Sequence, residues 1–141
     1  MKDVPNKERT TLAANHKLLI ACLFASIIIS TTYYYLDARN EVYQVQWLAV
    51  SISWYIATGF GTAKVLGKAR IGYLIAGIVF WTTFAFYMLD NWYTVFGGTL
   101  IAPRPDYTMT VRNFIGAAVA ALGILSSHNA FNKTRSKAKL V

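Results

Sequence analysis

Residues 71–89 read IGYLIAGIVFWTTFAFYML, an apolar run without a charged side chain. A run of about 19 residues extends about 30 Å as an α-helix, which matches the hydrocarbon core of a bilayer. A lone strand in lipid would leave its backbone N–H and C=O groups without hydrogen bonds, so the segment must be helical. The stretch therefore predicts a transmembrane helix from about Ile71 to Leu89.

Three further segments of similar length accompany it. Leu18–Leu36 is apolar and uncharged, Val42–Ala63 is uncharged but more polar, and Asn113–Phe131 is rich in glycine and alanine. We therefore predict an all-α integral membrane protein, a four-transmembrane-helix bundle that forms a single domain over residues 1–141. The long connection at 90–110 is predicted to lie outside the membrane.

The third and first predicted helices end alike. Residues 34–37 read YYLD and residues 87–90 read YMLD, so that an aspartate follows an aromatic helix end in both. Two related helical hairpins would explain this likeness. The favoured alternative is chance, because aromatic and acidic residues both recur at the outer membrane interface.

Basic residues alternate between the two sides of the predicted spans. Eleven of the 14 Lys and Arg residues fall before the first segment, between the second and third, or after the fourth: Lys2, Lys7, Arg9, Lys17, Lys64, Lys68, Arg70, Lys133, Arg135, Lys137 and Lys139. Arg39, Arg104 and Arg112 fall in the other two connections. The positive-inside rule then predicts that both termini and the middle connection are cytoplasmic, in the cell membrane.

Composition excludes several functional classes. The chain is 55% hydrophobic and 14% charged, and its net charge of +8 comes from short runs beside apolar segments, which disfavours nucleic-acid binding. No Asp, Glu, Lys or Arg lies in the central part of a predicted span, which weighs against a pump, a proton-coupled transporter or a voltage sensor. No nucleophile–base set, phosphate-binding glycine loop or zinc spacing occurs, so we expect no catalytic activity of its own.

Two sets of side chains are candidates for a cofactor or a metal. His16 and His128 are predicted at the same cytoplasmic boundary, where two imidazoles could ligate a haem or a copper ion. Asp37, Glu41 and Asp90 are predicted on the outer side and could form a cation site if the two hairpins meet. The favoured alternatives are histidines at the water interface and carboxylates that are solvated. Nothing in the sequence requires a cofactor.

Small residues mark candidate helix-packing faces. Small side chains at spacings of three and four let helix backbones approach closely, which is a principal source of helix association in lipid. The predicted packing positions are Gly116, Ala120, Gly123, Ser127, Gly59, Ala63, Gly72 and Ala76.

Small size, uncharged span interiors and packing faces favour an accessory or structural subunit of a larger membrane complex. The complex could be an oxidoreductase whose cofactors lie on other subunits. The main alternative is a self-assembling pore or a holin-like permeabiliser, and a weaker one is a haem-binding electron carrier. The expected partners are other membrane subunits or further copies of the chain, together with the bilayer, whose anionic lipids would attract the basic cytoplasmic ends.

Overall fold

The computed structural model describes residues 6–36, 45–96 and 107–138, and these ranges are helical apart from one short turn. They form α1 (Asn6–Leu36), α2 (Val45–Leu66), α3 (Arg70–Phe96) and α4 (Tyr107–Ala138). Each helix contains all or nearly all of one predicted segment. The all-α prediction is confirmed.

Three of the four helices have the composition of membrane spans. Within the described ranges, Leu12–Thr32, Arg70–Trp92 and Val111–Thr134 are long and apolar enough to cross a membrane. Helix α2 is not among them, because polar side chains such as Gln46 and Ser53 interrupt its apolar residues. The composition of α1, α3 and α4 is therefore that of a membrane protein.

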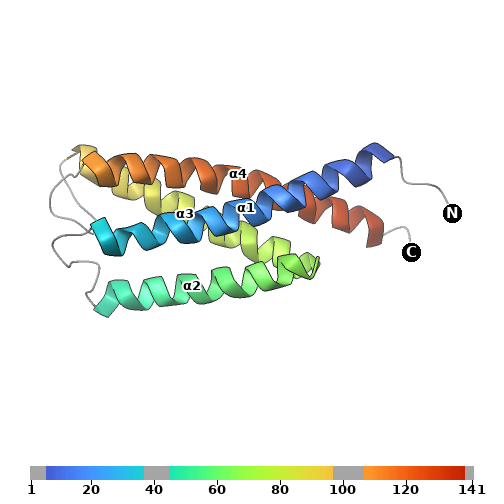
Figure 1. The fold of residues 1–141 in the computed structure, drawn as a ribbon, viewed down its shortest axis with the longest axis horizontal. Coiled ribbons are helices and arrows are strands. Elements are labelled where there is room, and N and C mark those ends of the chain that lie inside the picture. Colours follow the sequence, from blue (N-terminus) through green and yellow to red (C-terminus); the bar gives the residue numbers. More distant parts are fainter. Residues whose placement is uncertain (1–5, 37–44, 97–106, 139–141) are drawn as a thin grey trace.

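The four helices lie lengthwise beside one another, but their contacts are unequal (Figure 1). Helix α3 packs closely on α4 and on α2, and α1 packs on α4, whereas α1 and α2 make few close approaches. Both ends of the described chain lie at the end of the molecule that carries the α2–α3 turn, where α1 and α4 extend beyond it (Figure 1). We call this the termini end and the opposite end the loop end. The two hairpins are thus packed differently: α3 and α4 tightly, α1 and α2 loosely.

The helices continue beyond the predicted spans. The region 90–110 was predicted as a connection, but α3 runs on to Phe96 and α4 already begins at Tyr107. Residues 90–96 and 107–110 are therefore helical, residues 97–106 lie outside the described residues, and the placement of 90–110 outside the membrane stays a prediction. Asp90 and Arg112 both lie within helical, buried stretches.

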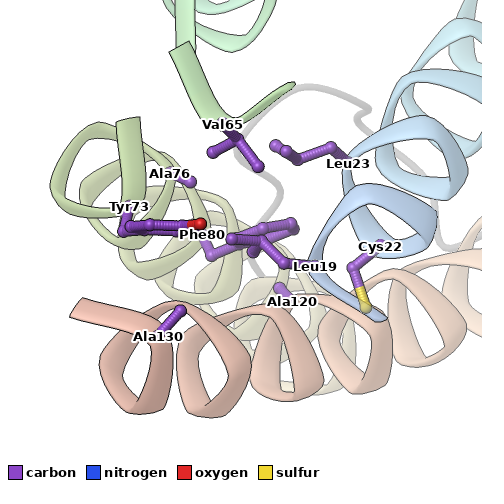
Figure 2. Close-up of a cluster of buried hydrophobic side chains, with 9 residues drawn as sticks. All are labelled: Leu19, Cys22, Leu23, Val65, Tyr73, Ala76, Phe80, Ala120 and Ala130. Atoms are coloured by element: carbon purple, nitrogen blue, oxygen red, sulfur yellow. The ribbon is translucent and has the colours of Figure 1, made fainter. Parts of the chain in front are cut away.

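The apolar core lies where α1, α3 and α4 meet the end of α2 (Figure 2). Its members include Leu19 and Leu23 of α1, Val65 of α2, and Phe80 of α3, all without exposed surface. Lipid tails are as apolar as these side chains, so packing contacts rather than exclusion from water hold the helices together. Close packing is possible because α4 presents Ala120 and Ala130 to this core.

A tight turn joins α2 to α3. The Ala69 N–H donates to the Lys64 carbonyl at 2.9 Å and the Lys68 N–H donates to the Val65 carbonyl at 2.8 Å, the bonds of a Schellman motif. The motif needs a left-handed residue, and Lys68 occupies that place with φ 55°. Glycine is the usual residue there, because a Cβ strains this conformation.

Candidate functional site

Polar side chains from three helices gather near the loop end. We call the set the loop-end cluster. It consists of Ser30 of α1, Tyr87, Asp90 and Asn91 of α3, and Arg112 and Asn113 of α4. Ionisable side chains within apolar helices are rare and mark functional or structural sites, so this cluster is the candidate site of the chain.

An amide joins the two charged members of the cluster. The Asn113 amide Nδ2 donates to Asp90 Oδ2 at 2.5 Å, and Arg112 Nη2 donates to Asn113 Oδ1. Asp90, Arg112 and Asn113 are 6%, 7% and 1% exposed. A buried carboxylate and a buried guanidinium need opposite charge and hydrogen bonds to be tolerated. The relay through Asn113 gives each charged group a hydrogen bond and fastens α3 to α4.

Tyr87 extends the cluster toward α1. The Arg112 guanidinium lies 5.6 Å from the centroid of the Tyr87 ring, and the Tyr87 hydroxyl is 3.2 Å from Ser30 Oγ. A cation over an aromatic face is an attractive contact. The ring fits against α4 because Gly116 has no Cβ; one built there would collide with the ring of Tyr87. Tyr87 therefore links α1 to the α3–α4 pair.

Asn91 differs from the other members of the cluster. Its side chain is 4% exposed, and within the described part of the chain neither amide atom has a hydrogen-bond partner. A buried amide without partners costs about 1–3 kcal/mol. Within the cluster, the Asn113 amide is hydrogen-bonded at both its oxygen and its nitrogen, whereas the Asn91 amide has no hydrogen-bond partner among the described residues.

The sequence carried a signal for this cluster. The buried positions of α3 recur at spacings of three and four and end on Tyr87 and Asp90. On α4, Asn113 lies three residues before Gly116 and continues the stripe of small residues predicted to pack. In the sequence, Arg112 and Asp90 look like charges that flank the apolar segments. In the structure, each lies at the end of a row of buried positions.

The predicted cation site has one described member. Asp37 and Glu41 lie outside the described residues, and Asp90 bonds to Asn113 rather than facing solvent. The interpretation of Asp90 as a solvated charge is wrong. In the parts of the chain that the structure describes, no three His, Cys, Asp or Glu side chains are grouped as metal ligands. The Asp90 carboxylate accepts a charge-assisted hydrogen bond from Asn113.

The two histidines occupy different surroundings at the termini end. His16 Nδ1 lies 3.0 Å from the Tyr73 hydroxyl, with the two rings edge to face, and so links α1 to α3. His128 is exposed, and its Nε2 lies 2.8 Å from Nδ2 of Asn132, one turn further along α4. Each ring has one nitrogen engaged within the protein, and a shared haem or copper remains a prediction from the sequence.

Helix α2 is tied to its neighbours by side-chain hydrogen bonds. Trp54 Nε1 donates to Thr83 Oγ1 of α3 at 2.8 Å, and the Tyr55 hydroxyl lies 3.0 Å from Thr31 Oγ1 of α1. In lipid, hydrogen bonds between helices contribute about 0.6 kcal/mol each on average. These bonds position α2 where its backbone packing is sparse on the α1 side.

The predicted packing residues separate into two groups. Six are buried between helices of this chain: Gly72, Ala76, Gly116, Ala120, Gly123 and Ser127. Gly59 and Ala63 are exposed on α2, and a Cβ built at Gly59 would meet nothing within 4 Å. These two small residues of α2 thus lie on an open face, whereas Gly61 of the same helix packs against Ile75 of α3.

Comparison of the chain with protein-family models, with curated proteins and with solved structures finds no match.

Proposed function

We propose that this chain is a small accessory subunit of a larger membrane complex, which crosses the cell membrane four times with both termini in the cytoplasm. The observation that carries the subunit role is the outward face of α2. This face consists of Ile52, Ser53, Ile56, Gly59, Phe60 and Ala63, all of them exposed.

The outward face of α2 combines large and small exposed side chains, as a helix-packing surface does. Ile52, Ile56 and Phe60 are exposed large side chains, while Gly59 and Ala63 lie one turn apart and leave the backbone between those side chains uncovered. Surfaces of this kind accept the side chains of a second helix. The described parts of α1 and α3 also expose bulky side chains such as Phe24 and Trp81, which suit lipid, but they expose no glycine among them.

Of the four helices, α2 would be stabilised most by a neighbouring partner helix. It is the one described helix without a stretch apolar enough to cross a membrane by composition alone, it carries the exposed side chain of Ser53, and it makes few close approaches to α1. A polar side chain that faces hydrocarbon is unfavourable, and a neighbouring protein helix can satisfy it. A partner helix on this face would cover the side chains of α2 that α1, α3 and α4 leave exposed.

The interior supports a structural rather than a conducting role. The Thr58, Thr62 and Thr83 hydroxyls each donate to a carbonyl of their own helix at 2.7 Å. These three side chains are also buried, so their hydroxyls do not face an aqueous path in the single chain. A pore would therefore need several copies of the chain. The test below distinguishes such an assembly from a complex with other subunits.

The charge distribution supports the proposed topology. Lys64, Lys68 and Arg70 lie at or beside the α2–α3 turn, which is at the termini end (Figure 1). Lys17 follows His16, which contacts Tyr73 in the first turn of α3, and Lys133 lies two residues after Phe131, which contacts Arg70. Asp90 belongs to the last two turns of α3, toward the loop end. Basic residues concentrate on the cytoplasmic side of membrane proteins, so the termini end is assigned to the cytoplasm. Helix α2 runs alongside the three apolar helices and is assigned as the fourth span.

The experiment compares substitutions on two kinds of exposed face. The tagged chain is purified from its native membrane in mild detergent as wild type, Gly59→Leu, Ala63→Leu, Ala85→Leu and Ala118→Leu. Ala85 and Ala118 are exposed on α3 and α4 and serve as matched controls. We expect the two α2 variants to lose a co-purifying chain that the wild type and both controls retain.

Two results would contradict the subunit role. One is a wild-type chain that is purified as a monomer without any partner. The other is an assembly made only of copies of this chain, which would favour the pore. Chemical crosslinking followed by mass determination separates these two results from the expected complex.

A further inference from the structure

Basic side chains from every helix surround the termini end. We call this set the basic collar: Lys17 of α1, Lys64 of α2, Lys68 of the turn, Arg70 of α3 and Lys133 of α4. The first four are exposed and Lys133 is half-buried. Arg70 begins the apolar stretch of α3, and Lys133 is one residue before the end of that of α4. Arg70 and Lys133 therefore lie at the boundary of the apolar surface, where lipid headgroups are found.

Four of the five collar cations have no carboxylate beside them within the described surroundings: Lys17, Lys64, Lys68 and Arg70. Among residues 12–32, 45–92 and 111–134, Asp90 is the one carboxylate, and it lies at the loop end in a bond with Asn113. These four cations create a positive potential at one level of the molecule. Such a potential attracts anionic lipid, at about 1 kcal/mol for each basic residue near the surface.

Arg70 is held in place for such a ligand. Its guanidinium carbon lies 4.3 Å from the centroid of the Phe131 ring of α4. Stacking occupies the face of the guanidinium and leaves its N–H edge available, and that edge matches the paired oxygens of a phosphate group. A cation already fixed in position loses less conformational freedom when it binds.

The collar adjoins exposed apolar surface. Leu66 precedes the turn, Ile71 follows Arg70, and Leu74 lies one turn further along α3; all three are exposed. A soluble phosphate would use only the charges, whereas a phospholipid would place its phosphate on the collar and its acyl chains on these residues. The adjoining charged and apolar surfaces thus select an amphipathic anion.

We propose that the basic collar binds an anionic phospholipid, with Arg70 as the phosphate contact and Lys68 beside it. The proposal rests on the membrane-spanning part of the proposed function and not on the subunit role. The isolated chain therefore suffices to test it, whatever partner the complex contains.

The test measures binding of defined lipids to the full chain in detergent. Native mass spectrometry and thermophoresis compare short-chain phosphatidylglycerol, the zwitterionic phosphatidylcholine and inorganic phosphate. The variants are Lys68→Gly, Arg70→Gln and the pair together. Lys68→Gly removes a charge at a φ that suits glycine, so its effect on binding is separate from any loss of fold. Arg39→Gln with Arg104→Gln is the control of equal charge.

We expect phosphatidylglycerol to bind more tightly than phosphatidylcholine and to be weakened about fivefold by Lys68→Gly and about 30-fold by the pair, with the control unchanged. Equal binding of both lipids would overturn the proposal, as would equal loss in the control. Inorganic phosphate that binds as tightly as phosphatidylglycerol would show a soluble anion site instead.

Discussion

At the scale of single residues, the absence of a Cβ decides where helices meet. A Cβ at Gly123 would lie 2.5 Å from the Phe80 ring, whose side chain is fully buried and has no room to move aside. A Cβ at Gly59 would meet nothing within 4 Å. Two glycines that look alike in sequence therefore have opposite structural roles, one between helices and one on an open face.

Alanine at these two glycines should change stability in opposite directions. Gly123→Ala forces a methyl group into the Phe80 ring and is expected to lower the free energy of unfolding by about 1–3 kcal/mol. Gly59→Ala adds helix propensity in open space and is expected to raise it by up to about 1 kcal/mol. Unfolding of the purified chain in mixed detergent and SDS measures both. Equal losses in the two variants would contradict the packing described.

The two asparagines of the loop-end cluster provide a second matched pair. Asn113→Leu deprives Asp90 and Arg112 of the amide that joins them and is expected to lower the free energy of unfolding by about 2–3 kcal/mol. Asn91→Leu replaces a buried amide without hydrogen-bond partners in the described chain and is expected to raise it by about 1–3 kcal/mol. The same SDS titration gives both values. Destabilisation by Asn91→Leu would show that this amide has a partner.

At the scale of elements, α2 is the least firmly attached helix. Helices α3 and α4 share a long contact and the Asn113–Asp90 bond, whereas α2 packs mainly on α3 and makes few close approaches to α1. Hydrogen bonds from Trp54 and Tyr55 supplement that packing. Local opening follows the parts of a protein with the fewest contacts, so α2 should open first.

Amide hydrogen exchange tests the weak attachment of α2. In the isolated chain we expect α2 to exchange faster than α3 and α4, and Trp54→Phe to accelerate it further by removing the 2.8 Å bond to Thr83. Phenylalanine keeps the apolar ring, so the change reports mainly the lost donor. Exchange in α2 as slow as in α3 would mean that the helix is held more firmly than its contacts indicate.

At the scale of the whole molecule, the sequence predicted the helices better than the contacts between them. The apolar run at 71–89 lies within α3, and the stripe from Gly116 to Ser127 is buried as expected. Both features depend on local composition and spacing. The burial of Asp90 and Arg112 depends on which helices face each other, and a count of flanking charges treats such residues as solvated. The exposure of Gly59 and Ala63 likewise follows from the loose pairing of α1 with α2.

Positive charge is concentrated at one end of the molecule. The basic collar lies at one end of the molecule. The hydrogen bonds that join one anion, Asp90, through Asn113 to one cation, Arg112, lie at the other, so the described chain has one positive end. That end favours the cytoplasm under the positive-inside rule. The proposed orientation and the proposed lipid contact therefore depend on the same residues.

The central claim is that the chain crosses the membrane four times, and α2 is the helix on which it depends. Because Cys22 is the only cysteine and is buried, a Cys22→Ser background permits single cysteines at Asn40, Lys68, Arg104 and Lys137. The measurement is labelling of intact cells with a membrane-impermeant maleimide. The account predicts that positions 40 and 104 react from outside and that 68 and 137 react only after permeabilisation. Labelling of positions 40 and 68 from the same side would contradict it.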